Sequence, residues 1–193
     1  MATAYISHRD CLQHDTGAGH PENAGRIAAI EDRFLATGLL DVLRYVDAPT
    51  VTERQLLRVH TESHLETLAA MAPASGFARL DPDTIISPGS LPAARRAAGA
   101  VIAAVDLVAS GETESAFCCI RPPGHHAESN RAMGLCLYNN IAVGVAHALE
   151  EYGLEKVAVV DFDVHQGNGT EEKIGRASWM VRGGGWGVGG GCG

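Results

Sequence analysis

Apolar positions along the chain fall into short continuous runs and longer stretches with helical spacing. The short runs that predict strands lie at residues 4–6, 43–46, 116–120 and 157–160. The stretches with apolar residues three or four positions apart, which predict helices, lie at residues 24–36, 52–71, 90–110 and 139–151. Residues 72–89 form a long polar loop rich in proline and glycine. This alternation of strand and helix predicts an α/β fold with a mostly parallel sheet and flanking helices.

Polar residues able to bind a metal directly follow the last of these apolar runs. Residues 157–160 are wholly apolar, as expected of a strand buried on both faces of a parallel sheet. Side chains alternate along extended backbone, so Asp161, Asp163 and His165 are expected to point to one side. Two carboxylates and an imidazole favour zinc or a related divalent ion. The structural alternative is that Asp161 caps a helix and the following glycines form a turn.

A second cluster with chemical potential is the pair His125 and His126, which follows a Pro-Pro-Gly turn after the strand at 116–120. Histidine is the side chain best suited to proton transfer near neutral pH. Two adjacent histidines alone are more often a feature of the surface than a catalytic pair. Sites in open α/β sheets form beyond the carboxyl ends of strands, however, and that position favours a catalytic role.

Composition narrows the class of protein. A chain of 193 residues suits one domain. Its net charge of -8 argues against direct binding of nucleic acid. No apolar run reaches the roughly 20 residues of a membrane span, and the N-terminus has no signal-peptide pattern, so we expect a cytoplasmic protein without a membrane partner. The five cysteines match no zinc-finger spacing and are expected to be reduced thiols.

The composition changes after Ile174, and eight of the eleven residues at 183–193 are glycine. A glycine-rich segment buries too little apolar surface to offset its chain entropy. We therefore expect an α/β domain over residues 1–175 and a tail without regular structure over residues 176–193.

Several motifs resemble the histone deacetylase superfamily, which includes bacterial acetylpolyamine amidohydrolases and acetoin-utilisation proteins. The specific ones are RPPGHHAESNRAMGLCLYNN and VAVVDFDVHQGNGT, supported by GHPENAGR, VHTESHL and DPDTIISPGS. The resemblance covers about residues 4–174. It implies the arginase-deacetylase fold, one catalytic zinc ion, and hydrolysis of acetyl-lysine, acetylpolyamines or similar acetyl amides.

The resemblance also implies roles for individual residues. Asp163 and His165 would be two zinc ligands. His125 and His126 would flank the reacting water, with His126 as the general base. Asp161 would hold His125, and its backbone would help to form a structural potassium site.

Four further positions carry implied roles at the rim of the site. Asn168 stands where the partner of the second histidine is expected, as in class II and bacterial members. Asp83 would lie on the rim loop that holds the substrate backbone. Gly134 and Leu135 would line the substrate channel, where Leu135 replaces a frequent phenylalanine.

Two elements of the family mechanism have no match in the sequence. No aspartate follows Asp163 to serve as the third zinc ligand, and no tyrosine follows Tyr152 to stabilise the oxyanion. We therefore expect a family domain truncated before its final strands, with impaired hydrolysis and with exposed edges that favour association, including formation of a homo-oligomer. The alternatives are a non-catalytic fragment that binds a ligand or partner and, ranked low, an arginase-like dimanganese hydrolase.

Overall fold

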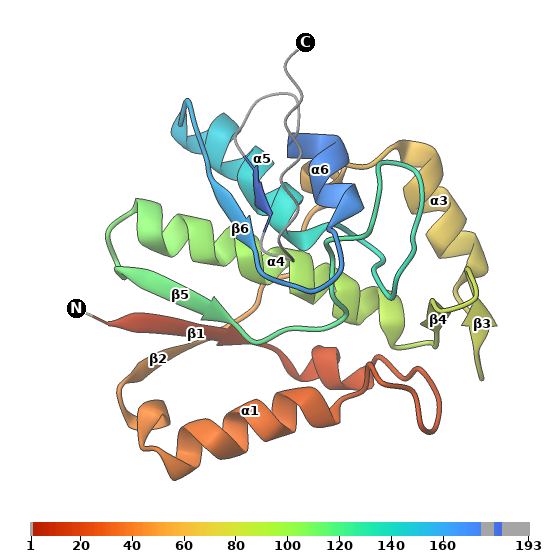
Figure 1. The fold of residues 1–193 in the computed structure, drawn as a ribbon, viewed down its shortest axis with the longest axis horizontal. Helices are drawn as coiled ribbons and strands as arrows, with labels where there is room; N and C mark the ends of the chain where they lie inside the picture. Colours follow the sequence, from red (N-terminus) through yellow and green to blue (C-terminus); the bar gives the residue numbers. More distant parts are fainter. Residues whose placement is uncertain (1, 175–179, 183–193) are drawn as a thin grey trace.

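The computed structural model describes residues 2–174 and 180–182 as three layers, a parallel sheet between helices (Figure 1). The strands are β1 (Thr3–Ser7), β2 (Leu43–Asp47), β3 (Ala78–Arg79), β4 (Ile85–Ile86), β5 (Ser115–Cys118), β6 (Val159–Asp161) and β7 (Met180–Arg182). The helices are α1 (Gly25–Ala36), α2 (Glu53–Leu56), α3 (Glu62–Met71), α4 (Ser90–Ala109), α5 (Asn140–Tyr152) and α6 (Asn168–Ile174), with short 3-10 helices η1 (Arg9–Gln13) and η2 (Leu39–Asp41).

The main sheet has the order β2-β1-β5, and all three strands are parallel. Its central strand is buried on both faces because side chains alternate along β1. Ala4 and Ile6 pack toward Ala100 of α4, whereas Tyr5 packs toward Ile27 of α1. Helices therefore cover both faces of this sheet, as the sequence predicted.

Glycines allow α4 to pack closely against its neighbours. A Cβ atom added at Gly99 of α4 would lie 1.9 Å from the carbonyl oxygen of Pro49. A Cβ at Gly144 of α5 would lie 2.3 Å from Cγ1 of Val101 on α4. The largest apolar cluster lies where α4 and α5 meet α2 and α3. This packing holds α5 against α4, and α4 in turn covers one face of the main sheet.

The strand predicted at 157–160 differs most from expectation. β6 begins only at Val159 and pairs with β7 in a separate two-stranded sheet. Val160 is 65% exposed, so the expected burial on both faces is wrong. The physical reason is that, in the part of the chain that the structure describes, no strand lies between β5 and β6 to cover this run.

The helix expected over residues 90–110 is α4, which begins at Ser90 with Gly89 at its N-cap. Of the segment 176–193, which was expected to lack regular structure, the structure describes only Met180–Arg182, which forms β7 and pairs with β6. The rest of that segment lies outside the described residues. None of the described helices is long and apolar enough to cross a membrane.

Candidate active site

A buried ion pair anchors the segment that carries the two histidines. Arg121 is completely buried, and its guanidinium donates to both carboxylate oxygens of Glu22 at 2.8 Å. It also donates to the carbonyl oxygen of Cys11 at 2.8 Å. A buried guanidinium must be paired and hydrogen-bonded to be tolerated. The start of the Arg-Pro-Pro-Gly turn is thereby fixed to two segments far away in the sequence.

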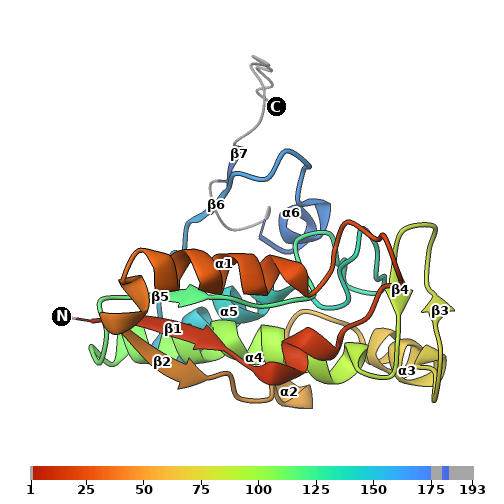
Figure 2. The same ribbon diagram turned by 90° about the horizontal axis from the view of Figure 1, so that it is seen from below.

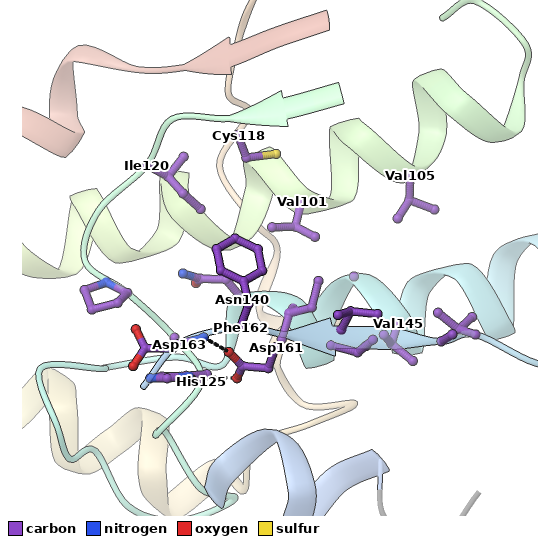
Figure 3. Close-up of a pocket in the computed structure, with 18 of the residues that line it drawn as sticks. Val101, Val105, Cys118, Ile120, His125, Asn140, Val145, Asp161, Phe162 and Asp163 are labelled. Carbon is purple, nitrogen blue, oxygen red and sulfur yellow. Dashed lines mark hydrogen bonds and ion pairs between the residues drawn. The ribbon is translucent and has the colours of Figure 1, made fainter. Parts of the chain in front are cut away.

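His125 is paired with a carboxylate. Its Nδ1 lies 2.9 Å from Oδ2 of Asp161, the last residue of β6 (Figure 3). A carboxylate only accepts hydrogen bonds, so Nδ1 of His125 carries the proton in this pair. Gly167 allows the close approach, since a Cβ there would lie 2.6 Å from Oδ2 of Asp161. This contact joins the segment that follows β5 to the end of β6.

His126 is paired with a neutral amide. Its Nδ1 lies 2.7 Å from Oδ1 of Asn168, and Nδ2 of Asn168 donates to Glu128 at 2.8 Å. The contact with Glu128 orients the amide, so Asn168 accepts from His126 and Nδ1 carries the ring proton. The two histidine rings lie 4.1 Å apart between centroids. Among the described residues, neither Nε2 atom has a hydrogen-bond partner, so both nitrogens are available to a substrate or water.

Asp163 and His165 do not continue an extended strand as expected. Instead, the backbone N–H of Asp163 donates to the carboxylate of Asp161 at 3.1 Å. The backbone N–H of His165 donates to the carboxylate of Asp163 at 2.8 Å. The N–H of His165 holds the pKa of the Asp163 carboxyl below its usual range, and the nearby histidines act in the same direction. The side chains of Asp163 and His165 are 49% and 74% exposed. The structure thus brings these residues together through turns and not through alternation.

The donor set for a metal is incomplete. Nδ1 of His165 lies 3.2 Å from Oδ1 of Asp163, and the His126 and His165 rings are 6.1 Å apart. Over residues 2–174 and 180–182, no three His, Cys, Asp or Glu side chains are arranged to hold a metal ion. A catalytic zinc site normally has three protein ligands. The described residues therefore do not by themselves fit a zinc ion.

The remaining predicted residues lie around the histidine pair. Gly134 has a φ of 55°, and a Cβ there would lie 2.5 Å from Cδ2 of His126. Leu135 also has a positive φ, of 70°, and its N–H donates to Thr84 at 3.1 Å. Asp83 is exposed in the loop that contains Thr84. The rim loop and the 134–135 turn are therefore adjacent, with Gly134 against His126.

Sequence reasoning missed the buried histidine that supports the next loop. His60 accepts from the N–H of Asn139 at 2.9 Å and contacts the carbonyl oxygen of Glu128 at 2.9 Å. Asn139 in turn caps α5 through the N–H of Ala142. The motif VHTESHL contains His60, but contacts with residues almost 80 positions away cannot be deduced from spacing.

Comparison with known proteins places the chain in a family. A model of the histone deacetylase domain matches residues 20–179. A histone deacetylase-like amidohydrolase from Pseudomonas aeruginosa is 42% identical over 160 residues, covering 83% of this chain and 42% of that protein. A probable deacetylase from Archaeoglobus fulgidus is 36% identical over 174 residues, covering 89% of this chain and 48% of that protein. The chain belongs to the histone deacetylase family.

A solved structure agrees with this assignment. The crystal structure of the HDA15 HD domain superposes with a TM-score of 0.87 at 32% identity, covering 94% of this chain. The match covers 53% of that structure. The arginase-deacetylase fold expected from the sequence is thus confirmed, and the chain spans about half the length of the relatives it matches.

Proposed function

We propose that this chain forms the proton-transfer side of a zinc-dependent deacetylase site that acts on acetyl-lysine, acetylpolyamines or similar acetyl amides. The observation that carries the proposal is the pairing of the two histidines. His125 is held by a carboxylate and His126 by an amide, with both Nε2 atoms unpaired among the described residues. Membership of the histone deacetylase family supports the reaction class.

The different partners of the two histidines suit them to different roles. Both rings carry the proton on Nδ1, so each presents a basic Nε2 nitrogen. His126 has only a neutral amide beside it and is proposed to take a proton from the attacking water and return it to the leaving amine. His125, held by the charged Asp161, is proposed to stabilise negative charge that develops on the substrate.

In this proposal, only two residues of the chain would bind the zinc ion. Asp163 and His165 would supply two ligands, one oxygen and one nitrogen, which suits zinc. The third ligand is not supplied by the described residues. That incomplete set favours a second candidate function for the isolated chain, namely binding an acetylated ligand or a partner without turnover. The arginase-like alternative requires more carboxylates around Asp163, and the described residues provide no such cluster.

A chimera tests the deacetylase proposal. Residues 1–174 would be joined to the segment that follows the matched region in the Pseudomonas aeruginosa relative. We expect the chimera to bind zinc and release acetate from an acetyl-lysine peptide or an acetylpolyamine. His126→Ala should lower kcat by about 100- to 10,000-fold because the proton acceptor is lost. Its zinc content should not change, because His126 is not a proposed ligand.

His147→Ala is the matched control, since His147 lies on α5 and pairs with Asp106 of α4, away from both active-site histidines. This variant should keep the kcat of the chimera. A chimera that binds zinc but hydrolyses neither substrate would contradict the proposed function. Hydrolysis that survives His126→Ala would contradict the role of that histidine.

A further inference from the structure

The carboxylate of Glu128 lies one hydrogen bond beyond the amide that holds His126. Nδ2 of Asn168 donates to Oε1 of Glu128 at 2.8 Å. Over residues 2–174 and 180–182, this is the one side-chain contact of the carboxylate, and Glu128 forms no ion pair. Its side chain is half-buried. The charge of Glu128 therefore reaches the histidine pair through a neutral amide.

Backbone contacts hold the two segments of this pair together. The N–H of Thr170 donates to the carbonyl oxygen of His125 at 3.1 Å. A Cβ atom added at Gly169 would lie 2.1 Å from the carbonyl oxygen of Ala127, so the two backbones nearly touch. Figure 1 and Figure 2 both show α6 next to the loop that leads from β5 to α5. Because these contacts involve the backbone, either side chain of the pair can be replaced without separating the segments.

The partners of an amide decide which of its two ends faces His126. A carboxylate only accepts hydrogen bonds, so Glu128 attracts the NH₂ end of Asn168 and turns the oxygen toward Nδ1 of His126. Nδ2 of Asn168 also lies 3.4 Å from the carbonyl oxygen of His126 and 3.4 Å from Sδ of Met133. That carbonyl contact is long and a thioether is a weak acceptor, so the charged carboxylate at 2.8 Å has the largest effect.

The reversed amide would put the proton of His126 on the wrong nitrogen. If the NH₂ group faced Nδ1, that nitrogen would have to accept and the ring proton would move to Nε2. An Nε2 atom that already carries a proton cannot take another from the attacking water. A histidine base in the wrong tautomer loses most of its catalytic effect.

We propose that Glu128 is a positioning residue that sets the tautomer of His126 through Asn168, and that its charge excludes a carboxylate from position 168. The inference deepens the proposed role of His126 as general base and rests on that role. A carboxylate at position 168 would face Glu128 across the 2.8 Å that the hydrogen bond spans. Two carboxylates at such a distance repel unless they share a proton. The carboxylate and the amide therefore act as one unit.

NMR of the ring nitrogens tests the tautomer in the full 193-residue chain. Histidines would be labelled with ¹⁵N, and the His126 signals would be identified by their loss in His126→Ala. At about pH 8, where an ordinary histidine is neutral, we expect the parent chain to carry the proton on Nδ1. Glu128→Gln can donate as well as accept, so the amide of Asn168 can adopt either orientation and both tautomers should be populated.

Glu172→Gln is the matched control. The Glu172 carboxylate joins the same two segments by accepting from the N–H of Ser129 at 2.8 Å, and it makes no hydrogen bond with Asn168. This variant should keep the proton of His126 on Nδ1. Circular dichroism would check that each variant is folded.

A double variant tests the exclusion of a second charge. Asn168→Asp should lower the midpoint of urea unfolding, and in the chimera it should lower kcat about 10-fold or more, because two carboxylates then face each other. Adding Glu128→Gln should restore the midpoint and bring kcat to within about threefold of the parent, since the new amide donates to the carboxylate at position 168. A merely structural role of Glu128 predicts two additive losses instead.

Two results would overturn the inference. One is a Glu128→Gln chain that keeps the proton on Nδ1 as completely as the parent and the control do. The other is an Asn168→Asp substitution that costs as much in the Glu128→Gln background as in the parent. The expected tautomers, combined with a chimera that hydrolyses neither substrate, would support this inference and contradict only the proposed function.

Discussion

Arg121 shows how a single buried charge can position an active-site segment. A guanidinium removed from water loses its hydration, and only close carboxylate and carbonyl partners replace it. Glu22 and Cys11 provide those partners at 2.8 Å. The cluster extends to His14, whose Nε2 lies 3.4 Å from Glu22. Burial lowers the pKa of His14 to about 4, so this histidine is neutral at pH 7.

The two most shifted histidines predict how stability depends on pH. Burial lowers the pKa of both His14 and His60 to about 4. Each folded-state pKa lies below the unfolded value, so the unfolded chain binds more protons between about pH 4 and pH 6.5. Their stabilising contribution is complete above about pH 6.5 and is lost as the pH falls. We expect urea unfolding to show a loss of about 2 kcal/mol per histidine between pH 7 and pH 5.

His60→Gln provides the comparison for this prediction. The variant should be less stable at pH 7, because its hydrogen bonds with Asn139 and Glu128 are altered. Its stability should nevertheless change less between pH 7 and pH 5, because one titrating group has been removed. An equal pH dependence in both proteins would contradict the assignment to His60.

Motifs in the sequence identified the candidate site residues but not the buried residues that position them. The candidates His125, His126 and Asp161 were predicted because two separate motifs place them directly after predicted strands. Glu22 and Arg121 are 99 positions apart, and no local pattern links them. Contacts of this kind depend on the packed fold, so their roles emerge only from the structure.

Among the elements, the close packing of α4 predicts effects of different size for two helical glycines. Glycine to alanine favours a helix by about 1 kcal/mol at either position. At Gly99 the new Cβ would meet the Pro49 carbonyl, a backbone atom that a side-chain rotation cannot move. At Gly144 it would meet the Val101 side chain, which can rotate.

We therefore expect Gly99→Ala to destabilise the chain by about 1–3 kcal/mol through overpacking. Gly144→Ala, the matched control, should cost less because the same helix preference offsets a contact that can relax. Urea unfolding of the two variants and the parent chain would measure the difference. Equal stability of all three proteins would show that α4 can shift away from the 48–51 segment.

The helices and the main sheet were predictable because their patterns are local, whereas the burial of β6 was not. The stretch that became α5 has apolar spacing, an Asn139 cap and a Gly153 stop, all within a few residues. An apolar run such as 157–160 signals only that burial is favourable. Whether it is buried depends on neighbouring strands, and none covers Val160 in the described part of the chain.

At the scale of the whole molecule, an apolar groove and the incomplete donor set occur at the same place. This groove, lined by α4, α5, the end of β5 and residues 157–164, ends at His125 and Asp163, and the two proposed ligands, Asp163 and His165, are one fewer than a catalytic zinc site normally has. Both features are consistent with a chain that spans about half of its relatives' domains. The described residues therefore provide only part of the donor set that a catalytic zinc site normally has.

This relation predicts the zinc content of the full chain and of the chimera with the segment of the Pseudomonas aeruginosa relative. Asp163 and His165 are both strongly exposed and would hold zinc against water with only two protein ligands. After dialysis against buffer without metal, we expect well below one zinc ion per chain by atomic emission spectroscopy. The chimera should retain about one ion. His165→Ala should remove the ion from the chimera, whereas His147→Ala should not. One tightly held zinc ion in the chain alone, lost in His165→Ala, would show that the chain supplies a third ligand itself.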